Sequence, residues 1–517
     1  MTPITTISST SELLLLGLYF AVLGIMAVYG LHRLFIVWLY HRYRRSAPVA
    51  PMAPDILPSV TVQLPIFNER YVVEGLLDAV ARIDYPRELL EVQVLDDSTD
   101  DTCLLVSERV ARLRKEGLDI VHLHRSDRVG FKAGALEAGL QRAAGELICV
   151  FDADFLPPAT ILHRMLPHFA DPRVGMVQAR WEHLNREYSL LSRMQAIQLD
   201  AHFAIEHAAR NRSGRFFNFN GTAGIWRRSA IEDAGGWQHD TLTEDLDISY
   251  RAQVKGWRFV YVNEVAAPAE LPIEMRGFKN QRHRWTKGAV QTARKMLARI
   301  WRSDVPLRAK VEATFHLTAN INYPLNLLLA VLIVPAMMVR LRSGSTSFLL
   351  LDAPVFLLGT GSVCLYYLLA QRELGRSSVV GLVSLPVVMA IDASIALNNT
   401  VAVVEGFGRE PGEFVRTPKF SLRSPDECWH SRFYRGRGNW IHWAELLFGV
   451  YFTVAVVLVA RAGLWPAVPF LMLYQFGYLY TAAVSISQRH AARPLAYAPV
   501  VPPASGARAW SQRAGGG

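Results

Sequence analysis

The sequence predicts an α/β domain placed between membrane-spanning α-helices, and three observations predict it. Long, nearly uncharged segments lie near the N-terminal end and again after residue 315. Residues 41–315 between them are rich in charged side chains, which is typical of a water-exposed domain. Within that part, short apolar segments alternate with amphipathic ones, and this alternation favours a mostly parallel sheet with helices on both faces.

The first apolar segment, residues 13–40, predicts a transmembrane helix, because about 20 apolar residues suffice to cross a bilayer. This segment is nearly uncharged, with His32 and Arg33 as the only exceptions. A signal peptide is the alternative, but residues 1–12 contain no basic residue and the apolar segment is too long for one. We therefore expect residues 1–45 to form an N-terminal transmembrane helix.

Five further apolar segments follow, at about residues 316–339, 348–370, 379–404, 443–459 and 464–485. Buried core helices are the alternative, but so many apolar segments clustered in one part of the chain favour a membrane. We expect transmembrane or interfacial helices in residues 311–410 and two transmembrane helices in residues 443–490. The tail, residues 491–517, is rich in Pro, Ala and Gly and is expected to be disordered.

The net charge of +10 raises the possibility of a nucleic-acid or anionic partner. Basic residues cluster beside the apolar segments, in residues 41–45, 340–342 and 489–493, where the positive-inside bias of membrane proteins explains them. We expect no nucleic acid as a partner. The four cysteines, Cys103, Cys149, Cys364 and Cys428, have no paired spacing, which indicates neither a disulfide framework nor a zinc site.

Polar side chains follow three predicted strands of the α/β domain. Strands are expected at residues 59–64, 91–95, 120–123, 147–151 and 175–179, with helices at 71–83, 101–115 and 131–143. Ligands of such folds bind beyond the carboxyl ends of the strands. Those ends carry residues 65–69, 96–100 and 152–154, in which acidic side chains are frequent. The sequence therefore predicts a ligand site, suited to a nucleotide, at this edge of the sheet.

Asp152 and Asp154 follow the apolar segment 147–151 and can bind a hard divalent cation through oxygen ligands. Mg²⁺ or Mn²⁺ there would bridge the phosphates of a nucleotide sugar and neutralise charge on a leaving diphosphate. An isolated Asp-X-Asp is more often a solvated turn. Its position after a strand, together with the motifs below, favours the metal site.

Asp96, Asp97 and Lys132 are weaker candidates for binding the nucleotide. The two carboxylates could accept hydrogen bonds from a base or ribose, although residues 98–100 are equally good helix N-caps. Lys132 could meet a phosphate as a point charge. An exposed lysine at the start of a helix is an equal alternative.

Two motifs later in the chain offer a candidate catalytic base and side chains that could bind the acceptor sugar. Asp245, in Thr243-Glu244-Asp245-Leu246-Asp247, could take the proton of an attacking hydroxyl, although it could also merely stabilise a helix N-terminus. Gln281, Arg284 and Trp285 could bring an amide, a cation and an indole to a sugar and a pyrophosphate. A helix at a membrane interface also favours Trp and Arg, and residues 275–301 have the basic pattern of such a helix.

With these motifs, the chain resembles the processive family-2 glycosyltransferases of the cellulose synthase and hyaluronan synthase group, and most of all the cellulose-synthase-like mannan and glucan synthases. The resemblance is strong over about residues 59–300 and weak after them. It rests on residues 96–100, 130–136, 152–154, 177–181, 219–224 and 243–247, and on Gln281-Arg282-His283-Arg284-Trp285, which fits the family motif Gln-X-X-Arg-Trp.

The resemblance implies a fold and a set of roles. Residues 46–310 would form a GT-A (Rossmann-like) catalytic domain with interfacial helices. Asp245 would be the catalytic base, and Asp152 and Asp154 the metal ligands. The nucleotide sugar would be bound by Pro65, Asn68, Glu69, Asp96, Asp97, Lys132 and Asp152, and the acceptor and diphosphate by Glu244, Gln281, Arg284 and Trp285.

The resemblance also implies a gating-like loop in residues 411–442, with Phe414, Thr417 and Lys419 in its motif. Arg416 stands where the family motif has Val, which leaves the loop's contact with nucleotide open. If every apolar segment after residue 310 crossed the membrane, Phe414 would lie opposite the catalytic domain. We therefore expect residues 379–404, interrupted by Asp392, Asn398 and Asn399, to be partly interfacial. About five crossings result, with the catalytic domain cytosolic.

The expected protein is a multi-pass enzyme of the inner (plasma) membrane that polymerises UDP-glucose or GDP-mannose, with inversion, into a β-linked glucan or mannan and exports it. Its partners would be the nucleotide sugar, the growing glycan, membrane lipid and accessory export subunits. A lipid glycosyltransferase acting on ceramide, diacylglycerol or a polyprenyl phosphate is the alternative. A transporter or scaffold with a degenerate transferase domain is disfavoured, because Asp152, Asp154 and Asp245 are intact.

Overall fold

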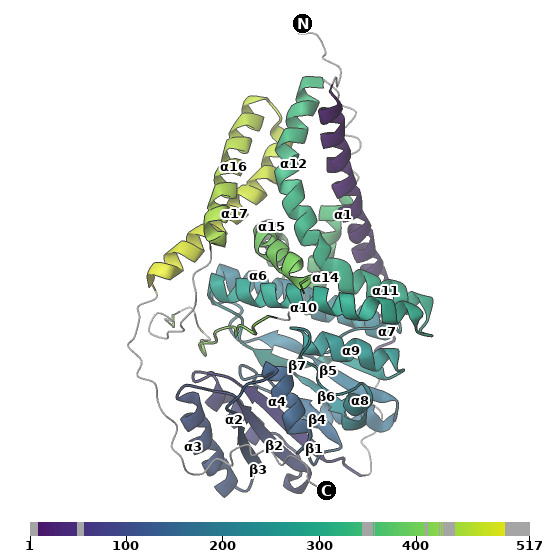
Figure 1. Cartoon of the computed structure of the whole chain (residues 1–517), viewed down its shortest axis with the longest axis vertical. Coiled ribbons are helices and arrows are strands. Elements are labelled where there is room, and N and C mark those ends of the chain that lie inside the picture. Colours follow the sequence, from purple (N-terminus) through teal and green to yellow (C-terminus); the bar gives the residue numbers. More distant parts are fainter. Residues whose placement is uncertain are drawn as a thin grey trace.

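The computed structural model describes residues 9–48, 56–343, 357–408, 412–422 and 440–491, with Val355, Ser424, Asp426 and Glu427. The expected disordered tail after residue 491 and most of the loop segment 423–439 lie outside the described residues. Helices α1 (Thr10–Tyr43), α12 (Asn322–Ser343), α16 (Ile441–Arg461) and α17 (Val468–Ala491) stand upright at one end (Figure 1). A sheet and its covering helices form the other end.

The sheet has seven strands in the order β3-β2-β1-β4-β6-β5-β7. Only β6 runs antiparallel to its neighbours within this sheet, so the predicted mostly parallel α/β fold is confirmed. The strands are β1 (Val60–Ile66), β2 (Leu90–Asp96), β3 (Asp119–His124), β4 (Leu147–Val150), β5 (Val174–His183), β6 (Gly224–Arg227) and β7 (Arg258–Ala269). The sequence pattern did not predict β6, which is only four residues long, or β7.

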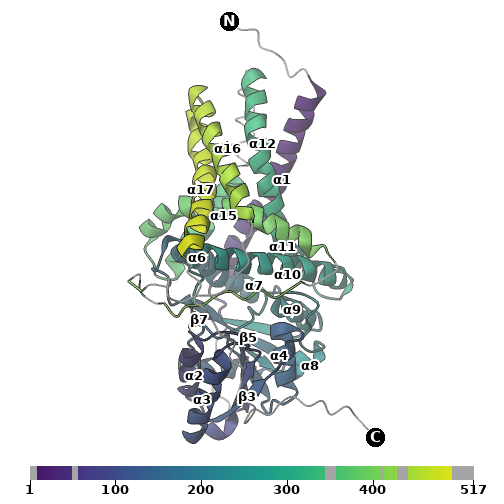
Figure 2. The same ribbon diagram turned by 60° about the vertical axis from the view of Figure 1, so that its left-hand side comes forward.

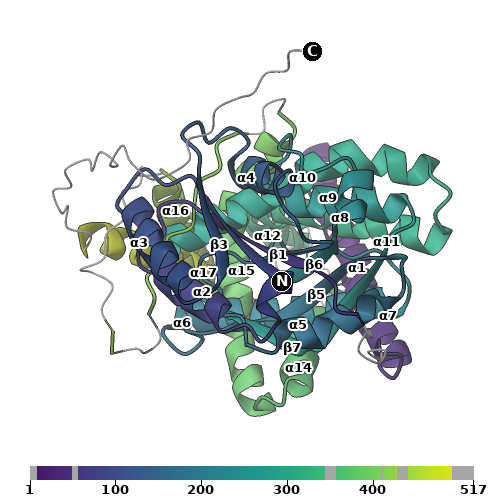
Figure 3. The ribbon, with the colours of Figure 1, turned by 90° about the horizontal axis from the view of Figure 1, so that it is seen from below.

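Helices cover both faces of this sheet, as Figure 3 shows from below. Alternate residues of β4 divide between two cores: Leu147 and Cys149 pack into the first, Ile148 and Val150 into the second. The first core includes α2 (Val73–Ala81), α3 (Thr102–Lys115) and α5 (Ile161–Met165). The second includes α4 (Phe131–Leu140), α8 (Arg228–Asp233) and α9 (Glu244–Val254). Apolar side chains on both sides of a strand are what a doubly covered parallel sheet requires.

A layer of helices lies crosswise between the sheet and the upright helices (Figure 2). It contains α6 (Leu190–Ala201), which continues through a π-helical turn (His202–His207) into α7 (Ala208–Arg212), and α10 (Met275–Arg302) and α11 (Leu307–Thr318). The predicted basic helix at residues 275–301 corresponds to α10. Helices α14 (Ser362–Glu373) and α15 (Ser378–Gly406) pack on α6, and α15 also packs on α10.

Short turns complete the described part of the chain. Three 3₁₀ turns, Arg87–Leu89, Leu166–Ala170 and Trp465–Ala467, precede β2, β5 and α17. A fourth, Ala319–Ile321, joins α11 to α12, and a π-helical turn, Leu357–Gly361, precedes α14.

Five helices in the described ranges are long and apolar enough to cross a membrane: Thr10–Tyr43, Leu307–Arg342, Ser378–Gly406, Ile441–Arg461 and Trp465–Gln488. Their outward faces carry large apolar side chains, among them Leu14, Val383 and Leu447, that stay exposed in the folded chain. Exposed apolar patches of this extent mark a surface that contacts lipid or another protein. The helices therefore indicate a membrane protein.

Helix α15 differs from the other four candidate spans. It is the most buried of them, with 56% of its apolar window inside the structure. It lies across the base of α12, α16 and α17 rather than beside them along their length (Figures 1 and 2). Part of the predicted apolar segment 348–370 lies outside the described residues, and its described part forms the turn before α14 and most of α14 itself.

Candidate active site

One cavity lies beyond the carboxyl ends of β1, β2 and β4, where the sequence predicted a ligand site. The start of α9, the first half of α10 and the loop segment 412–422 close it from the other side. Fourteen residues predicted for the site line it: Pro65, Glu69, Asp97, Lys132, Asp152, Asp154, Glu244, Asp245, Gln281, Arg284, Trp285, Phe414, Thr417 and Lys419. The carboxylates of Asp152, Asp154 and Asp245 therefore face one space.

Asp97 follows β2 and is held by Arg125, which follows β3. The Arg125 Nε donates to Asp97 Oδ1 at 2.7 Å, and Nη2 donates to Oδ2 at 2.5 Å, so the ion pair is bidentate. Burial raises the pKa of Asp97 above its ordinary value, and the Arg125 guanidinium opposes that rise. A carboxylate fixed in this way beside the cavity can accept a hydrogen bond from a nucleoside.

Asp152 follows β4 directly, and Lys132 reaches it from the first turn of α4. Lys132 Nζ lies 2.5 Å from Asp152 Oδ1 and donates to the Gly221 carbonyl at 2.9 Å. Gly130 and Phe131, which precede Lys132, adopt φ values of 72° and 51°. This left-handed backbone, which glycine adopts without strain, turns the chain so that α4 starts at the cavity.

Asp154 is paired with a lysine from a distant part of the chain. Lys419 Nζ lies 2.5 Å from Asp154 Oδ2 and also donates to the Glu270 carbonyl oxygen. The Glu270 carboxylate in turn accepts hydrogen bonds from the backbone N–H of Phe420, at 2.8 Å, and of Ser421, at 2.6 Å. Burial raises the pKa of Glu270 to about 7. These contacts seat the loop segment on the cavity.

Arg416 gives the loop a second attachment, at the end of β1. Its guanidinium donates to the Phe67 carbonyl at 3.2 Å and to the Asn68 carbonyl, and lies 3.1 Å from Glu69 Oε2. Burial raises the pKa of Glu69 to about 8, although Arg416 lowers it. The same loop contacts α10, since a Cβ at Gly277 would lie 3.5 Å from Pro418 Cδ.

Asp245 lies in the first turn of α9. Burial and, to a smaller extent, the neighbouring Glu244 raise its pKa to about 7, although Lys132 and Arg284 lower it. Asp245 Oδ2 is close to Gly221, where an added Cβ would lie 3.1 Å from that oxygen and 3.3 Å from Lys132 Nζ. Gly221 has a φ of 79°, so the position favours glycine for space and for backbone conformation.

Arg284 and Phe414 meet on the α10 side of the cavity. The Arg284 guanidinium lies 4.2 Å from the centre of the Phe414 ring, and Phe414 also stacks on Phe131 at 6.0 Å. Arg284 Nε is buried and has no hydrogen-bond partner among the described residues. A buried N–H without a partner costs free energy, so this donor suits an anionic ligand. Trp285 lies beside Arg282, whose guanidinium is 5.2 Å from its ring.

Charge balance tests whether a divalent cation fits the cavity. Seven carboxylates and five Lys or Arg side chains are among its described lining residues. Three of the seven, Glu69, Asp245 and Glu270, have pKa values raised to about 7 or 8, so the lining itself is close to charge balance, and a bound diphosphate would bring in uncompensated negative charge. A divalent cation offsets it, and Asp152 and Asp154, with oxygen donors only, offer the ligands that Mg²⁺ or Mn²⁺ prefers. The residues present therefore fit such a cation.

Two predicted nucleotide-binding residues are not among those that line the cavity. Asn68 instead ties β1 to β2: its backbone N–H donates to Ser98 Oγ at 2.8 Å, and its Oδ1 accepts from Thr99 N at 2.8 Å. Asp96 is fully buried, and its Oδ2 lies 2.8 Å from His122 Nε2. Strand alternation turns Asp96 away from the cavity, because Asp96 and Asp97 point to opposite sides.

The sequence motifs gave no role to several other lining residues, namely Phe67, Arg128, Trp181, His183, Asn220, Gly221, Glu270 and Arg416. Asn220 and Gly221 lie in a motif that carries the family resemblance, so a role could have been sought there. Glu270 follows β7, a strand that was not predicted. Arg416 was noted only as a departure from the family motif.

Comparison with known proteins agrees with this geometry. A model of a glycosyltransferase-like family 2 matches residues 58–288. Two curated relatives from Arabidopsis thaliana are similar: glucomannan 4-beta-mannosyltransferase 2, 43% identical over 251 residues, and glucomannan 4-beta-mannosyltransferase 7, 40% identical over 252 residues. Each match covers 48% of this chain, and 47% and 45% of the respective relative, so the chain spans about half their length.

Solved structures also show similarity at lower identity. A mannosyltransferase from Pyrobaculum calidifontis, in complex with GDP-Man and Mn²⁺, is 23% identical with a TM-score of 0.47, and the match covers 72% of this chain and 98% of that one. S. aureus TarS is 14% identical with a TM-score of 0.34, over 68% and 54% of the two chains. These matches bear out the predicted resemblance: residues 58–288 are similar to family 2 glycosyltransferases, and about half of the chain is similar to the two curated 4-beta-mannosyltransferases.

Proposed function

We propose that this chain is an inverting membrane glycosyltransferase that extends a β-1,4-linked mannan or glucomannan from a nucleotide sugar, with GDP-mannose as the preferred donor. The observation that supports this proposal most is the composition of the cavity. Asp152, Asp154 and Asp245 line it together with Arg284 and Trp285. The names of the two curated relatives, both 4-beta-mannosyltransferases, support mannose over glucose. UDP-glucose is the competing donor.

Asp245 is the proposed general base. The acceptor hydroxyl oxygen forms a bond to the anomeric carbon, the bond from that carbon to the diphosphate oxygen breaks, and Asp245 takes the hydroxyl proton. A pKa near neutrality suits this task, and burial raises the pKa of Asp245 to about 7. Attack on the face opposite the leaving diphosphate inverts the anomeric centre.

Asp152 and Asp154 are the proposed ligands of Mg²⁺ or Mn²⁺, which would supply charge neutralisation at the leaving diphosphate. Lys132 and Lys419 each lie 2.5 Å from one of these carboxylates. Both ammonium groups are proposed to contact phosphate oxygens of the donor. The unpartnered Arg284 Nε adds a further donor on the opposite wall of the cavity.

The loop segment 412–422 is proposed to close over the bound donor. Arg416 and Lys419 hold it to Glu69 and Asp154. Phe414 lies at the cavity together with residues of the sheet edge, so the loop and the domain share one side of the membrane. We place both in the cytosol at the plasma membrane and keep the expected arrangement of about five crossings, with the crosswise α15 partly interfacial. Export of the polymer is part of this proposal.

Product analysis tests the proposal. Membranes that contain the full chain are supplied with radiolabelled GDP-mannose or UDP-glucose and Mn²⁺, and the product is separated by size and by chloroform extraction. A high-molecular-weight product from GDP-mannose that endo-β-1,4-mannanase degrades supports the proposal. A chloroform-soluble glycolipid, or a polymer formed only from UDP-glucose, contradicts it. Membranes that carry Asp245→Asn serve as the control for background activity.

A further inference from the structure

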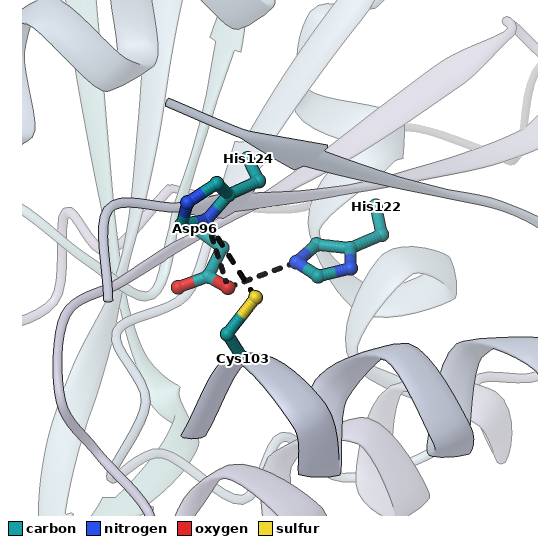
Figure 4. A group of neighbouring side chains, drawn as sticks. All are labelled: Asp96, Cys103, His122 and His124. Atoms are coloured by element: carbon teal, nitrogen blue, oxygen red, sulfur yellow. Dashed lines mark hydrogen bonds and ion pairs between the residues drawn. The ribbon is translucent and has the colours of Figure 1, made fainter. Parts of the chain in front are cut away.

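A second group of possible metal ligands lies outside the cavity lining. It consists of Asp96 at the end of β2, Cys103 in the first half of α3, and His122 and His124 on β3. Figure 4 shows the four side chains pointing toward one another from these three elements. His122 and His124 are two residues apart on one strand, so they lie on the same side of it. None of the four lines the cavity of the active site.

The separations between the ligand atoms are close to those of a tetrahedral metal site. One ligand atom from each residue lies within 4.8 Å of all the others. His124 Nδ1 is 3.5 Å from Asp96 Oδ2 and 3.8 Å from Cys103 Sγ. Zinc–ligand bonds of about 2.0–2.3 Å place ligand atoms roughly 3.3–3.6 Å apart in a tetrahedron. His122 Nε2, at 2.8 Å from Asp96 Oδ2, would have to move outward by about 0.5 Å.

We propose that Asp96, Cys103, His122 and His124 bind a zinc ion. Two imidazoles, one thiolate and one carboxylate form a mixed donor set that suits Zn²⁺ rather than Mg²⁺ or Ca²⁺. The Asp152 and Asp154 pair offers only oxygen donors and suits the harder ions. The two sites therefore differ in the metal that each selects.

The surroundings of the cluster support a bound ion. The other Asp96 oxygen, Oδ1, accepts a hydrogen bond from Ser98 N at 2.8 Å, which orients the carboxylate toward the histidines. The Asp96 side chain is fully buried, whereas those of His122 and His124 are 9% and 23% exposed. Strand β3 is the edge of the sheet, so an ion can enter from solvent.

The position of the cluster gives the zinc ion a structural role beside the active site. Asp96 precedes Asp97, and His124 precedes Arg125, the two residues of the bidentate ion pair at the cavity. An ion held by Asp96 and His124 would tie together the two strand ends that carry this pair. The ligands come from three elements, which explains why cysteine spacing alone did not indicate a zinc site.

Metal analysis of the purified full chain in detergent tests the proposal. After saturation with ZnCl₂ and desalting, mass spectrometry should find about one zinc ion per chain. Cys103→Ser and His124→Asn should each lower the retained zinc at least about tenfold. Cys364→Ser and His163→Asn, which change a cysteine and an exposed histidine elsewhere, should retain it. Substitution with Co²⁺ should give a thiolate-to-cobalt charge-transfer band that Cys103→Ser removes and Cys364→Ser keeps.

Three results would overturn the zinc site. The first is zinc at background level in the saturated wild-type chain. The second is equal zinc in the wild type and in the Cys103→Ser/His124→Asn double variant, with both proteins monodisperse. The third is loss of zinc in the Asp152→Asn/Asp154→Asn variant but not in Cys103→Ser, which would assign the ion to the active-site cavity.

Discussion

The two walls of the cavity are built in different ways. On one wall, Pro65, Asp97 and Asp152 lie at the ends of adjacent parallel strands, so backbone pairing within the sheet sets their spacing. The opposite wall consists of α9, α10 and the loop segment 412–422, which come from distant parts of the chain. Among the described residues, ion pairs and hydrogen bonds of side chains, several of them to backbone groups, hold the loop of that wall in place.

The sheet fixes the positions of the groups on the first wall, whereas the groups carried by the loop segment 412–422 reach the cavity only when the loop lies on it. Lys132 reaches Asp152 from within the sheet domain, whereas Lys419 reaches Asp154 from a segment 265 positions away in sequence. The first contact belongs to the folded domain itself. The second exists only while the loop segment lies on the cavity. Variants of the two walls should therefore fail in different ways.

The largest expected effect is that of Asp245→Asn, which removes the proposed base and keeps the shape of the side chain. We expect kcat to fall about 10²–10⁴-fold. Donor binding should change little, because Asp245 acts on the acceptor. Single-turnover assays and nucleotide titration measure the two quantities. Asp240→Asn, at an exposed carboxylate nearby, is the control. Turnover within a few-fold of wild type would exclude Asp245 as the base.

The next effect concerns the metal. Asp154→Asn should raise the Mn²⁺ concentration for half-maximal activity by about 10–100-fold, because a neutral amide is a poorer ligand than a carboxylate. The measurement is initial rate against Mn²⁺ concentration at saturating donor. Glu146→Gln changes an exposed carboxylate outside the cavity and should not move the curve. An unchanged metal requirement in Asp154→Asn would remove this residue from the ligand set.

The sequence predicted the strand-end wall well, for a physical reason. Apolar strands such as residues 147–150 are recognisable locally, and polar side chains that follow parallel strands must gather at one edge. Asp97 and Asp152 could be placed on that basis alone. Asp96, predicted beside Asp97, is not among the residues that line the cavity, because strand alternation turns it to the other side of β2, where His122 and His124 contact it.

The opposite wall could not be assembled from local patterns. Asp245 and Arg284 were candidates from their residue types, each with a structural alternative, and Phe414 was recognised only through the family resemblance. No periodicity or spacing relates α9, α10 and the loop. Glu270 was missed for the same reason, since its partners are backbone N–H groups 150 residues further along the chain. The sequence pattern also did not show that α15 lies crosswise, although the polar residues Asp392 and Asn398 in it suggested an interfacial position.

A third prediction is a pH dependence of kcat/KM that the pKa of Asp245 sets. Burial raises the pKa of Asp245 from 3.8 to about 7, and a base acts only when deprotonated. Below that pKa, kcat/KM for the acceptor should fall about tenfold per pH unit, and above it the profile should level off. An unshifted aspartate would give a flat profile near neutrality. Glu270→Gln should retain the acidic limb, because Glu270, whose pKa is also about 7, holds the loop instead.

The smallest expected effect is that of detaching the loop segment 412–422 from the end of β1. Arg416→Val removes the contacts with Glu69 and with the Phe67 carbonyl, and it restores the residue that the family motif carries. Because the loop would close less firmly over the donor, we expect KM for the nucleotide sugar to rise roughly three- to tenfold, about 0.6–1.4 kcal/mol. The value of kcat should stay near wild type, since Asp245 and Lys132 do not depend on Arg416. Steady-state kinetics measure both, with Val415→Ala, an exposed residue of the same loop, as control. If Arg416→Val lowered kcat as strongly as Asp245→Asn while KM stayed constant, Arg416 would act on the reacting groups rather than hold the loop on the cavity.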